Sequence, residues 1–156
     1  MTLNIQKTRQ FITQEDEENN LVKKIESITK SLRKQYFKNS LVTLSKKNIE
    51  NARTICNYII SEQTEINIKD STKEGKIKIL VWLSNHFQDK ESYRNMTRND
   101  ILEYLNTLRK SPIEDPTQKW IGSYNGRQMI LNKFFRWLYN PSHVNHNFSK
   151  IMNPYK

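Results

Sequence analysis

The chain has few of the residues that interrupt helices. Glycine occurs only at positions 75, 122 and 126, and proline only at 112, 116, 141 and 154. Tight turns and hairpins depend on these two residues, so their scarcity favours long helices over a β-sheet. No stretch alternates apolar and polar residues for long enough to predict a strand. We therefore expect an all-α protein, with a four-helix bundle and an additional N-terminal helix.

Cysteine is also scarce. Cys56 is the only one, which excludes an intramolecular disulfide, and its place on an apolar helical stripe predicts a buried residue in a reducing compartment. No apolar run approaches the ~20 residues of a membrane span, and the first residues lack a signal-peptide pattern. We expect a soluble, cytoplasmic protein with no membrane contact.

Acidic residues are absent from residue 116 to residue 156, and the whole chain has a formal net charge of +10. A field of this size attracts polyanions, so nucleic acid is the expected partner. A lysine-rich proteome is the competing explanation, because asparagine, isoleucine and lysine are all abundant here. Six basic residues fall in the acid-free stretch: Lys119, Arg127, Lys133, Arg136, Lys150 and Lys156.

Helical periodicity and helix-start signals give the expected organisation. Ser71 and Glu74 have the spacing of a capping box, Thr97 and Asp100 repeat it, and Pro141 predicts a helix end. The four helices of the bundle are predicted over residues 45–62, 71–87, 97–111 and 123–140. The expected regions are a disordered segment (1–16), an N-terminal helix and linker (17–44, with the helix over 15–38 and the linker over 39–44), a helical domain (45–141) and a tail (142–156).

The N-terminal helix carries a short apolar seam. Leu21, Ile25, Ile28 and Leu32 are spaced 4-3-4, the rhythm of a coiled coil, but over fewer than two heptads. The seam either docks the helix on its own domain or mediates self-association. The second possibility gives an alternative function, a protein-interaction module that oligomerises through these four residues.

Catalytic and metal-binding patterns are missing. The residues around Gly75 lack the spacing of a phosphate-binding loop. His143 and His146 have no cysteine or acid nearby to complete a metal site, and Cys56 has no histidine close in sequence. We expect no cofactor, no metal and no catalytic activity.

The last predicted helix has one apolar face and one polar, basic face. On a helical wheel Tyr124, Leu131, Phe134, Phe135 and Leu138 form the apolar face. The opposite face holds Asn125, Met129, Asn132, Lys133 and Arg136, with Gln128 at its border. Arginine can bind guanine, and asparagine or glutamine adenine, in the major groove, while lysine meets phosphates. A merely solvated face is the alternative.

Other cations complete the expected DNA-binding set. Arg127 falls toward the apolar side, where it would extend its stem to solvent or pair with Asp100 or Glu103. Five lysines are expected near helix starts, where backbone amides also favour anions: Lys46, Lys47, Lys73, Lys76 and Lys119.

Two motifs resemble the core-binding domain of tyrosine recombinases, the phage-integrase family. The first is Thr97-x-x-Asp100-Ile101-x-x-Tyr104-Leu105. The second is Phe134-Phe135-x-Trp137-Leu138, near the end of the last helix. The start of that helix over 122–127 and its ending over 138–141 look most like archaeal integrases. The similarity covers about residues 45–141.

The resemblance implies a four-helix SAM-like bundle that forms one half of a clamp around double-stranded DNA at a recombination site. In the family a separate C-terminal domain carries the nucleophilic tyrosine and a His-x-x-Arg motif. His86, His143 and His146 are not followed three residues later by arginine. The implied function is therefore a non-catalytic DNA-binding module, whose tail would lead toward an absent catalytic domain. A helix-turn-helix repressor is less favoured, because the short glycine-containing turn is missing.

Overall fold

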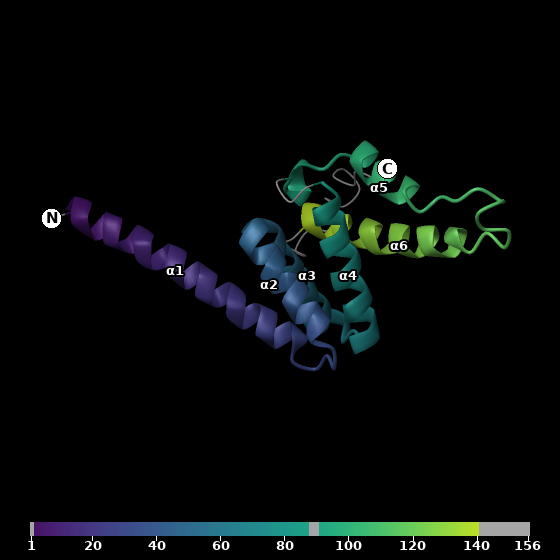
Figure 1. Cartoon of the computed structure of the whole chain (residues 1–156). Helices are drawn as coiled ribbons and strands as arrows, with labels where there is room; N and C mark the ends of the chain where they lie inside the picture. The colour runs from purple at the N-terminus through teal and green to yellow at the C-terminus, as the bar shows by residue number, and fades with distance from the viewer. Residues whose placement is uncertain (1, 88–90, 141–156) are drawn as a thin grey trace. The chain divides into compact units, whose positions relative to one another are not determined.

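The computed structural model describes residues 2–87 and 91–140, with side chains from residue 14 onward. Within these ranges it contains six α-helices, one 3-10 helix and no strand, which confirms the all-α prediction (Figure 1). The tail over 142–156, with His143 and His146, lies outside the described residues. The elements are α1 (Thr2–Thr29), α2 (Gln35–Lys47), α3 (Ile49–Ile66), α4 (Asp70–His86), η1 (Tyr93–Asn95), α5 (Arg98–Asn106) and α6 (Trp120–Tyr139).

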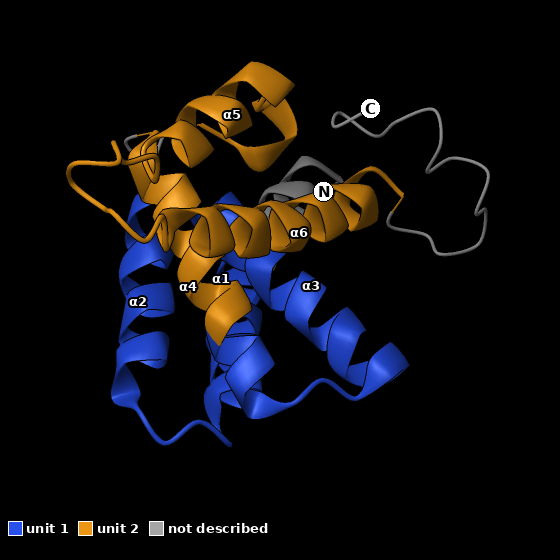
Figure 2. Cartoon of the chain, turned by 90° about the vertical axis from the view of Figure 1, so that its right-hand side faces the viewer, with its two compact units in different colours: residues 1–74 blue, residues 75–156 orange. Residues whose placement is uncertain are grey.

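The chain divides into two compact units (Figure 2). Unit 1 comprises residues 1–74 and unit 2 residues 75–156, so the boundary falls inside α4. A boundary at residue 45 was expected from the sequence. Residue 45 instead lies inside α2, which packs on α1 and α3, and this packing keeps the three helices in one unit.

Unit 1 is built around the apolar stripes of its three long helices. Leu21, Ile25 and Ile28 of α1 are at most 3 % exposed, so the predicted seam is buried within this chain. The other large buried apolar residues of the unit are Leu32, Phe37, Leu41, Leu44, Ile55, Cys56, Tyr58 and Ile59. The seam thus docks α1 on its own domain, the first of the two possibilities that the sequence left open.

Two predictions for the N-terminal region are wrong. Residues 2–16, expected to be disordered, are helical and belong to α1. Residues 39–44, expected to be a linker, lie inside α2. The first glycine is Gly75 and the first proline Pro112, so nothing in residues 1–74 breaks a helix strongly. Phe37, Leu41 and Leu44, spaced 4-3, give α2 a buried stripe that stabilises it.

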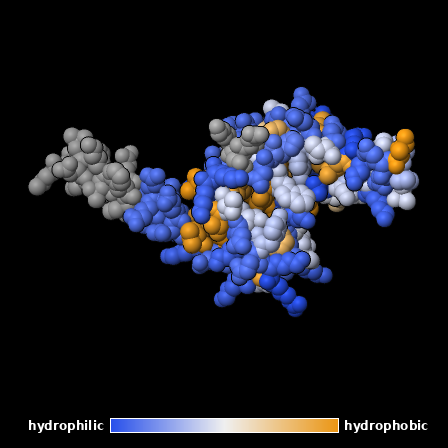
Figure 3. All heavy atoms as spheres, viewed as in Figure 1, coloured by the Kyte–Doolittle hydropathy of each residue, from blue (hydrophilic) through white to orange (hydrophobic). Residues whose placement is uncertain are grey.

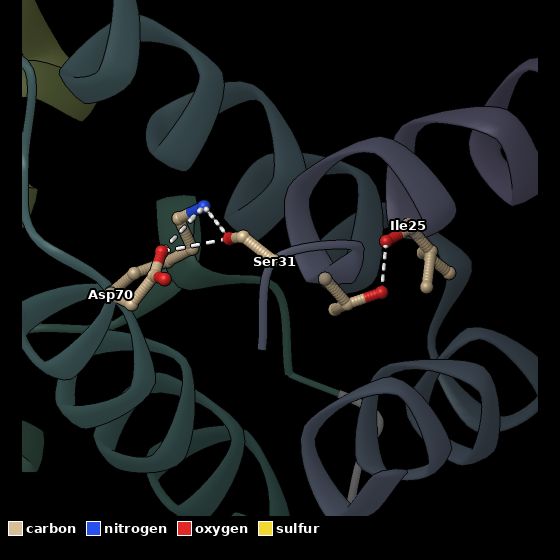
Figure 4. A network of polar contacts seen from close by, with 5 residues as sticks. Ile25, Ser31 and Asp70 are labelled. Carbon is tan, nitrogen blue, oxygen red and sulfur yellow. Dashed lines mark hydrogen bonds and ion pairs between the residues drawn. The ribbon is translucent and has the colours of Figure 1, made fainter. Parts of the chain in front are cut away.

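A polar network fixes the turn between α1 and α2 (Figure 4). The Ser31 hydroxyl donates to Oδ1 of Asp70 at 2.7 Å, and Nζ of Lys73 donates to the Ser31 oxygen at 3.3 Å. Lys73 Nζ also lies 3.7 Å from Asp70 Oδ1, and the Lys73 side chain is only 3 % exposed. At the end of α1 the Thr29 hydroxyl donates to the Ile25 carbonyl at 2.6 Å. The turn is therefore attached to the first turn of α4.

Unit 2 holds the aromatic core. Tyr93 in η1 is 1 % exposed and donates its hydroxyl to the Leu80 carbonyl of α4 at 2.6 Å. Its ring meets Phe134 of α6 edge to face, with 5.0 Å between centroids. Leu131, Phe134, Phe135 and Leu138 are at most 1 % exposed, so the predicted apolar face of α6 is confirmed at these four positions. Tyr124 is only half-buried.

The helix-start signals have different outcomes. Thr97 and Asp100 form both hydrogen bonds of the predicted capping box at the start of α5. Ser71 cannot cap α4 as predicted, because the helix already begins at Asp70 and Ser71 lies within it. The last helix begins three residues earlier than predicted, at Trp120, and incorporates Gly122 and Gly126.

One face of the molecule can be compared with the expectation of a polar exterior. Figure 3 shows that hydrophilic residues dominate the visible face and that hydrophobic residues appear there only in small patches. In the described part of the chain, no helix combines the length and apolarity needed to cross a bilayer.

Candidate nucleic-acid interface

The outward face of α6 is the predicted polar and basic face. Asn125, Met129, Lys133 and Arg136 are exposed, and Met129 is 73 % exposed. Their spacing of 4-4-3 places them on one side of the helix. The buried residues Leu131, Phe134, Phe135 and Leu138 hold the opposite side against the core, which fixes the direction in which the polar face points. The helix contains no acidic residue.

The two remaining amides of this set are less accessible. Gln128 and Asn132 are both half-buried. The Asn132 Oδ1 atom is buried and accepts no hydrogen bond within the described part of the chain. An asparagine that binds adenine uses its amide oxygen and nitrogen together. Asn132 would have to turn its amide outward to do so, whereas Asn125 already lies at the surface.

Two of the lysines expected to bind phosphate are buried. Lys73 is 3 % exposed and Lys76 is 4 % exposed, so neither offers its ammonium to an external anion. The expectation for these two residues is wrong, because Lys73 holds Ser31 and Asp70 together inside unit 1. Lys76 is enclosed by the fold as well.

Lys46 and Lys47 are exposed, but at the end of a helix and not at its start. They occupy the last turn of α2, where the helix dipole is negative and itself favours cations. The next helix, α3, is capped by Asn48, whose side chain accepts from the Asn51 amide at 3.1 Å. These lysines can meet a phosphate through their own charge, without the help of helix-start amides.

Lys119 is exposed at the N-cap position of α6, as expected. A carboxylate of the chain already lies at this helix start, since Asp115 Oδ2 accepts from the Trp120 amide at 3.0 Å. An external phosphate would therefore compete with Asp115 for the amides. Lys119 can still contribute its charge.

Arg127 ties three helices of unit 2 together. Its guanidinium lies 4.7 Å from the centre of the Trp82 ring in α4, and its Nη1 donates to the Tyr104 hydroxyl of α5 at 3.2 Å. Pairing with Asp100 or Glu103 was one expectation, but the partners are aromatic. Burial raises the pKa of Tyr104, and the neighbouring Arg127 lowers it in part. Arg127 is thus a structural cation and no part of the outward face.

A second stacked arginine positions the start of α6. The Arg109 guanidinium lies 5.3 Å from the Trp120 ring centre and 5.2 Å from that of Tyr124. Its Nε donates to Asn106 Oδ1 at 2.9 Å. Cation–π contacts of this kind stabilise by roughly 0.5–1 kcal/mol at exposed sites. Together with Asp115 they connect the loop after α5 to the first turn of α6.

A group of cations at the α1–α2 turn was not singled out from the sequence. Lys23, Lys30, Lys34 and Lys38 line one pocket of unit 1. One indication of this group was present in the sequence, a local excess of positive charge. From residue 23 to residue 47 the chain has eight basic residues and one acid, Glu26. Without the turn, the sequence did not show that four of these cations converge.

The described residues include no group of three or more histidine, cysteine, aspartate and glutamate side chains that could hold a metal ion. Cys56 is fully buried, and burial raises the pKa of its thiol to about 12. A thiol with such a pKa is a poor nucleophile near neutral pH. The arrangement of exposed groups can bind anions, chiefly along α6 and around the α1–α2 turn.

The function of this chain has to be inferred from the positions of its exposed side chains. The relevant ones lie on the outward face of α6 and at the lysine-lined pocket of unit 1. The sequence matches no family model and no curated protein, and the structure matches no solved structure.

Proposed function

We propose that this chain binds double-stranded DNA without cleaving it and that the outward face of α6 contacts the duplex. The observation that carries the proposal is the exposed set Asn125, Lys133 and Arg136 on a 20-residue helix with no acid. A single helix fits the major groove, where arginine and asparagine can bind base edges. Lysine beside them neutralises phosphate.

The proposal extends to the class of DNA-binding domain, the SAM-like core-binding domain of a tyrosine recombinase. Its support is the resemblance of two motifs, whose residues have structural roles in unit 2. Thr97 and Asp100 cap α5, and Tyr104 is buried at 4 % exposure. Phe134, Phe135 and Leu138 are fully buried in α6. Motifs that preserve a core in this way would leave the outward face of α6 free to vary with the DNA target.

Self-association through α1 is the less favoured function. The seam of Leu21, Ile25, Ile28 and Leu32 is at most 9 % exposed within the single chain. A dimer built on it would have to expose the core of unit 1 first. Burial of such a seam against its own domain already accounts for its apolar character.

Substitution on α6 tests the proposal. Lys133→Gln/Arg136→Gln removes two positive charges from exposed side chains. If both contact phosphate, the slope of log K against log salt becomes less negative by ~1.8, at ~0.9 per phosphate. If Arg136 binds a guanine instead, its part of the loss is ~1–3 kcal/mol for the preferred sequence only.

The matched control is Arg98→Gln/Lys110→Gln, which removes one arginine and one lysine from exposed positions of the same unit. Fluorescence anisotropy with a labelled duplex measures both variants. A loss specific to the α6 variant supports the proposal. Equal affinity and equal salt slope in the α6 variant, the control and the unmodified chain would reject α6 as the interface.

A further inference from the structure

The turn between α1 and α2 forms an open pocket of about 530 Å³ in unit 1. Four lysines line it, Lys23, Lys30, Lys34 and Lys38, and Glu26 is the single acid among its lining residues. Leu32, which is 9 % exposed, also lines it. The pocket therefore combines a concave shape with three net positive charges.

The positions of these lysines follow from the two helices. Lys23 lies on α1 and Lys30 directly follows its last residue, Thr29, seven positions or about two helical turns further along the chain. Lys34 precedes the first residue of α2 and Lys38 follows four residues later, so they share a face. The turn brings the two pairs to the same pocket. Lys23, Lys30 and Lys34 are exposed, and Lys38 is half-buried.

The backbone that carries the lysines is held in place. Ser31 lies between Lys30 and Lys34 and is bonded to Asp70 and Lys73. Leu32 and Phe37 are buried on either side of the α2 start. No side chain caps α2 at Lys34, so the positive end of the helix dipole adds to the field of the lysines. Several lysines on a backbone held in this way suit a ligand with several negative charges.

The lining residues also limit the chemistry of the ligand. They include no arginine and no aromatic residue, so the pocket offers neither a fork for a guanine nor a surface for base stacking. Lysine meets phosphate as a point charge, whatever the base. The volume exceeds that of one phosphate group. The pocket is therefore suited to binding several consecutive phosphate groups and is not suited to sequence-specific contacts with bases.

We propose that this pocket binds the phosphodiester backbone of DNA, as a contact in unit 1 that acts in addition to α6 in unit 2. The inference rests on the proposed function for the identity of the polyanion. It assigns the phosphate contacts to Lys23, Lys30, Lys34 and Lys38, in place of the buried Lys73 and Lys76. Binding at this pocket is strong at low salt and indifferent to base sequence.

The test uses the full chain and the variant Lys30→Gln/Lys34→Gln. Both side chains are exposed, so the fold should survive, and an unchanged melting temperature checks this. The salt slope for a labelled ~30-base-pair duplex should become less negative by ~1.8, at ~0.9 per lost phosphate contact. The loss should be equal for unrelated duplex sequences.

The control Lys69→Gln/Lys110→Gln removes the same charge from exposed positions outside the pocket. If the pocket variant matches this control, the pocket is not a DNA contact, even if α6 substitutions still weaken binding. If the α6 variant binds like the unmodified chain while the pocket variant loses affinity, the pocket stands and the α6 assignment fails.

Titration with inorganic tripolyphosphate distinguishes a pocket that binds the DNA backbone from one that binds a small polyphosphate. Competition between tripolyphosphate and DNA that disappears in Lys30→Gln/Lys34→Gln supports the pocket as a backbone site. Binding of tripolyphosphate without any binding of DNA would overturn the proposal, because the pocket would then take a small polyphosphate.

Discussion

Lys73 and Lys133 have different roles, although both are lysines. Lys73 is 3 % exposed and connects Ser31 to Asp70, whereas Lys133 lies exposed on α6. Sequence could not separate these roles, because Ser31 and Lys73 are 42 positions apart. It did place Asn125, Lys133 and Arg136 correctly at the surface, since the helical period and the apolar face of α6 determine which side faces out.

Replacement of Asp70 tests the buried role of Lys73. Asp70→Asn removes the negative charge and leaves the enclosed Lys73 ammonium with neutral acceptors alone, the Ser31 hydroxyl and the new amide oxygen. Removal of one partner from a fully buried pair costs ~3–5 kcal/mol. The Asp70 side chain is 53 % exposed, so we expect a smaller loss of unfolding free energy, about 2 kcal/mol. Urea unfolding measures it.

The double variant Asp70→Asn/Lys73→Met is the control for this prediction. A methionine removes the buried charge and keeps an apolar stem of similar length. Stability should return most of the way to that of the unmodified chain. If Asp70→Asn alone leaves the urea midpoint unchanged, the network does not hold the α1–α2 turn.

Cys56 gives a pH dependence at the residue scale. Burial raises the pKa of its thiol from 9.0 to about 12. Below pH 9 the thiol is neutral in both the folded and the unfolded chain, so its ionisation takes nothing from the free energy of unfolding. As the pH rises from 9 toward 12, only the unfolded chain ionises, and stability falls. The loss from this group at pH 10 is about 1 kcal/mol.

Urea unfolding at pH 7.5 and pH 10 checks this sign. Cys56→Ala should show a smaller decrease between the two pH values than the unmodified chain. Tyr58, Tyr93 and Tyr104, whose pKa values burial also raises, account for the decrease that remains. A pH dependence that is identical with and without the thiol contradicts the burial of Cys56.

Among the elements, the start of α5 was predicted best. Thr97 and Asp100 identified α5, because both capping-box hydrogen bonds lie within four residues. α2 was missed, since its stripe of three buried residues is short and its polar positions include Asn39, Ser40 and Thr43, which favour helices only weakly. Its stability comes from packing on α1 and α3, and that tertiary contact was not visible in the sequence.

The capping box of α5 predicts the effect of one substitution. Thr97→Ala removes the hydroxyl that accepts from the Asp100 amide at 3.2 Å. Loss of such a cap costs ~1 kcal/mol. Thr43→Ala, at an exposed position inside α2, is the matched control and should be neutral or slightly stabilising, because alanine is the better helix former. Thermal unfolding by circular dichroism compares the two, and equal melting temperatures would argue against the cap.

Arg127 is the residue that connects the elements of unit 2. Arg127→Met keeps most of the apolar stem but loses the stacking on Trp82 and the bond to the Tyr104 hydroxyl. We expect a loss of ~1–2 kcal/mol in unfolding free energy. Arg98→Met, on an exposed side chain of α5, should change stability little. A similar small effect of both variants would mean that the stacked arginine adds nothing.

For the whole molecule, net charge is the broadest indication of function and also the least specific one. A net charge of +10 predicted a polyanionic partner without locating the contacts. Exposed cations occur at several places in the structure, among them α6 in unit 2 and the α1–α2 pocket in unit 1. The pocket required the turn at residues 30–34, which the predicted helix over 15–38 did not contain. We therefore propose two cationic contacts with DNA, one in each unit.

The most direct measurement is the affinity of the unmodified chain for a labelled ~30-base-pair duplex at several salt concentrations. Fluorescence anisotropy gives the slope of log K against log salt. Contacts at both surfaces predict a slope of roughly −4 or steeper, equivalent to about four or more neutralised phosphates. Absence of binding at low salt would contradict the account, and the positive charge would then have to be explained without DNA.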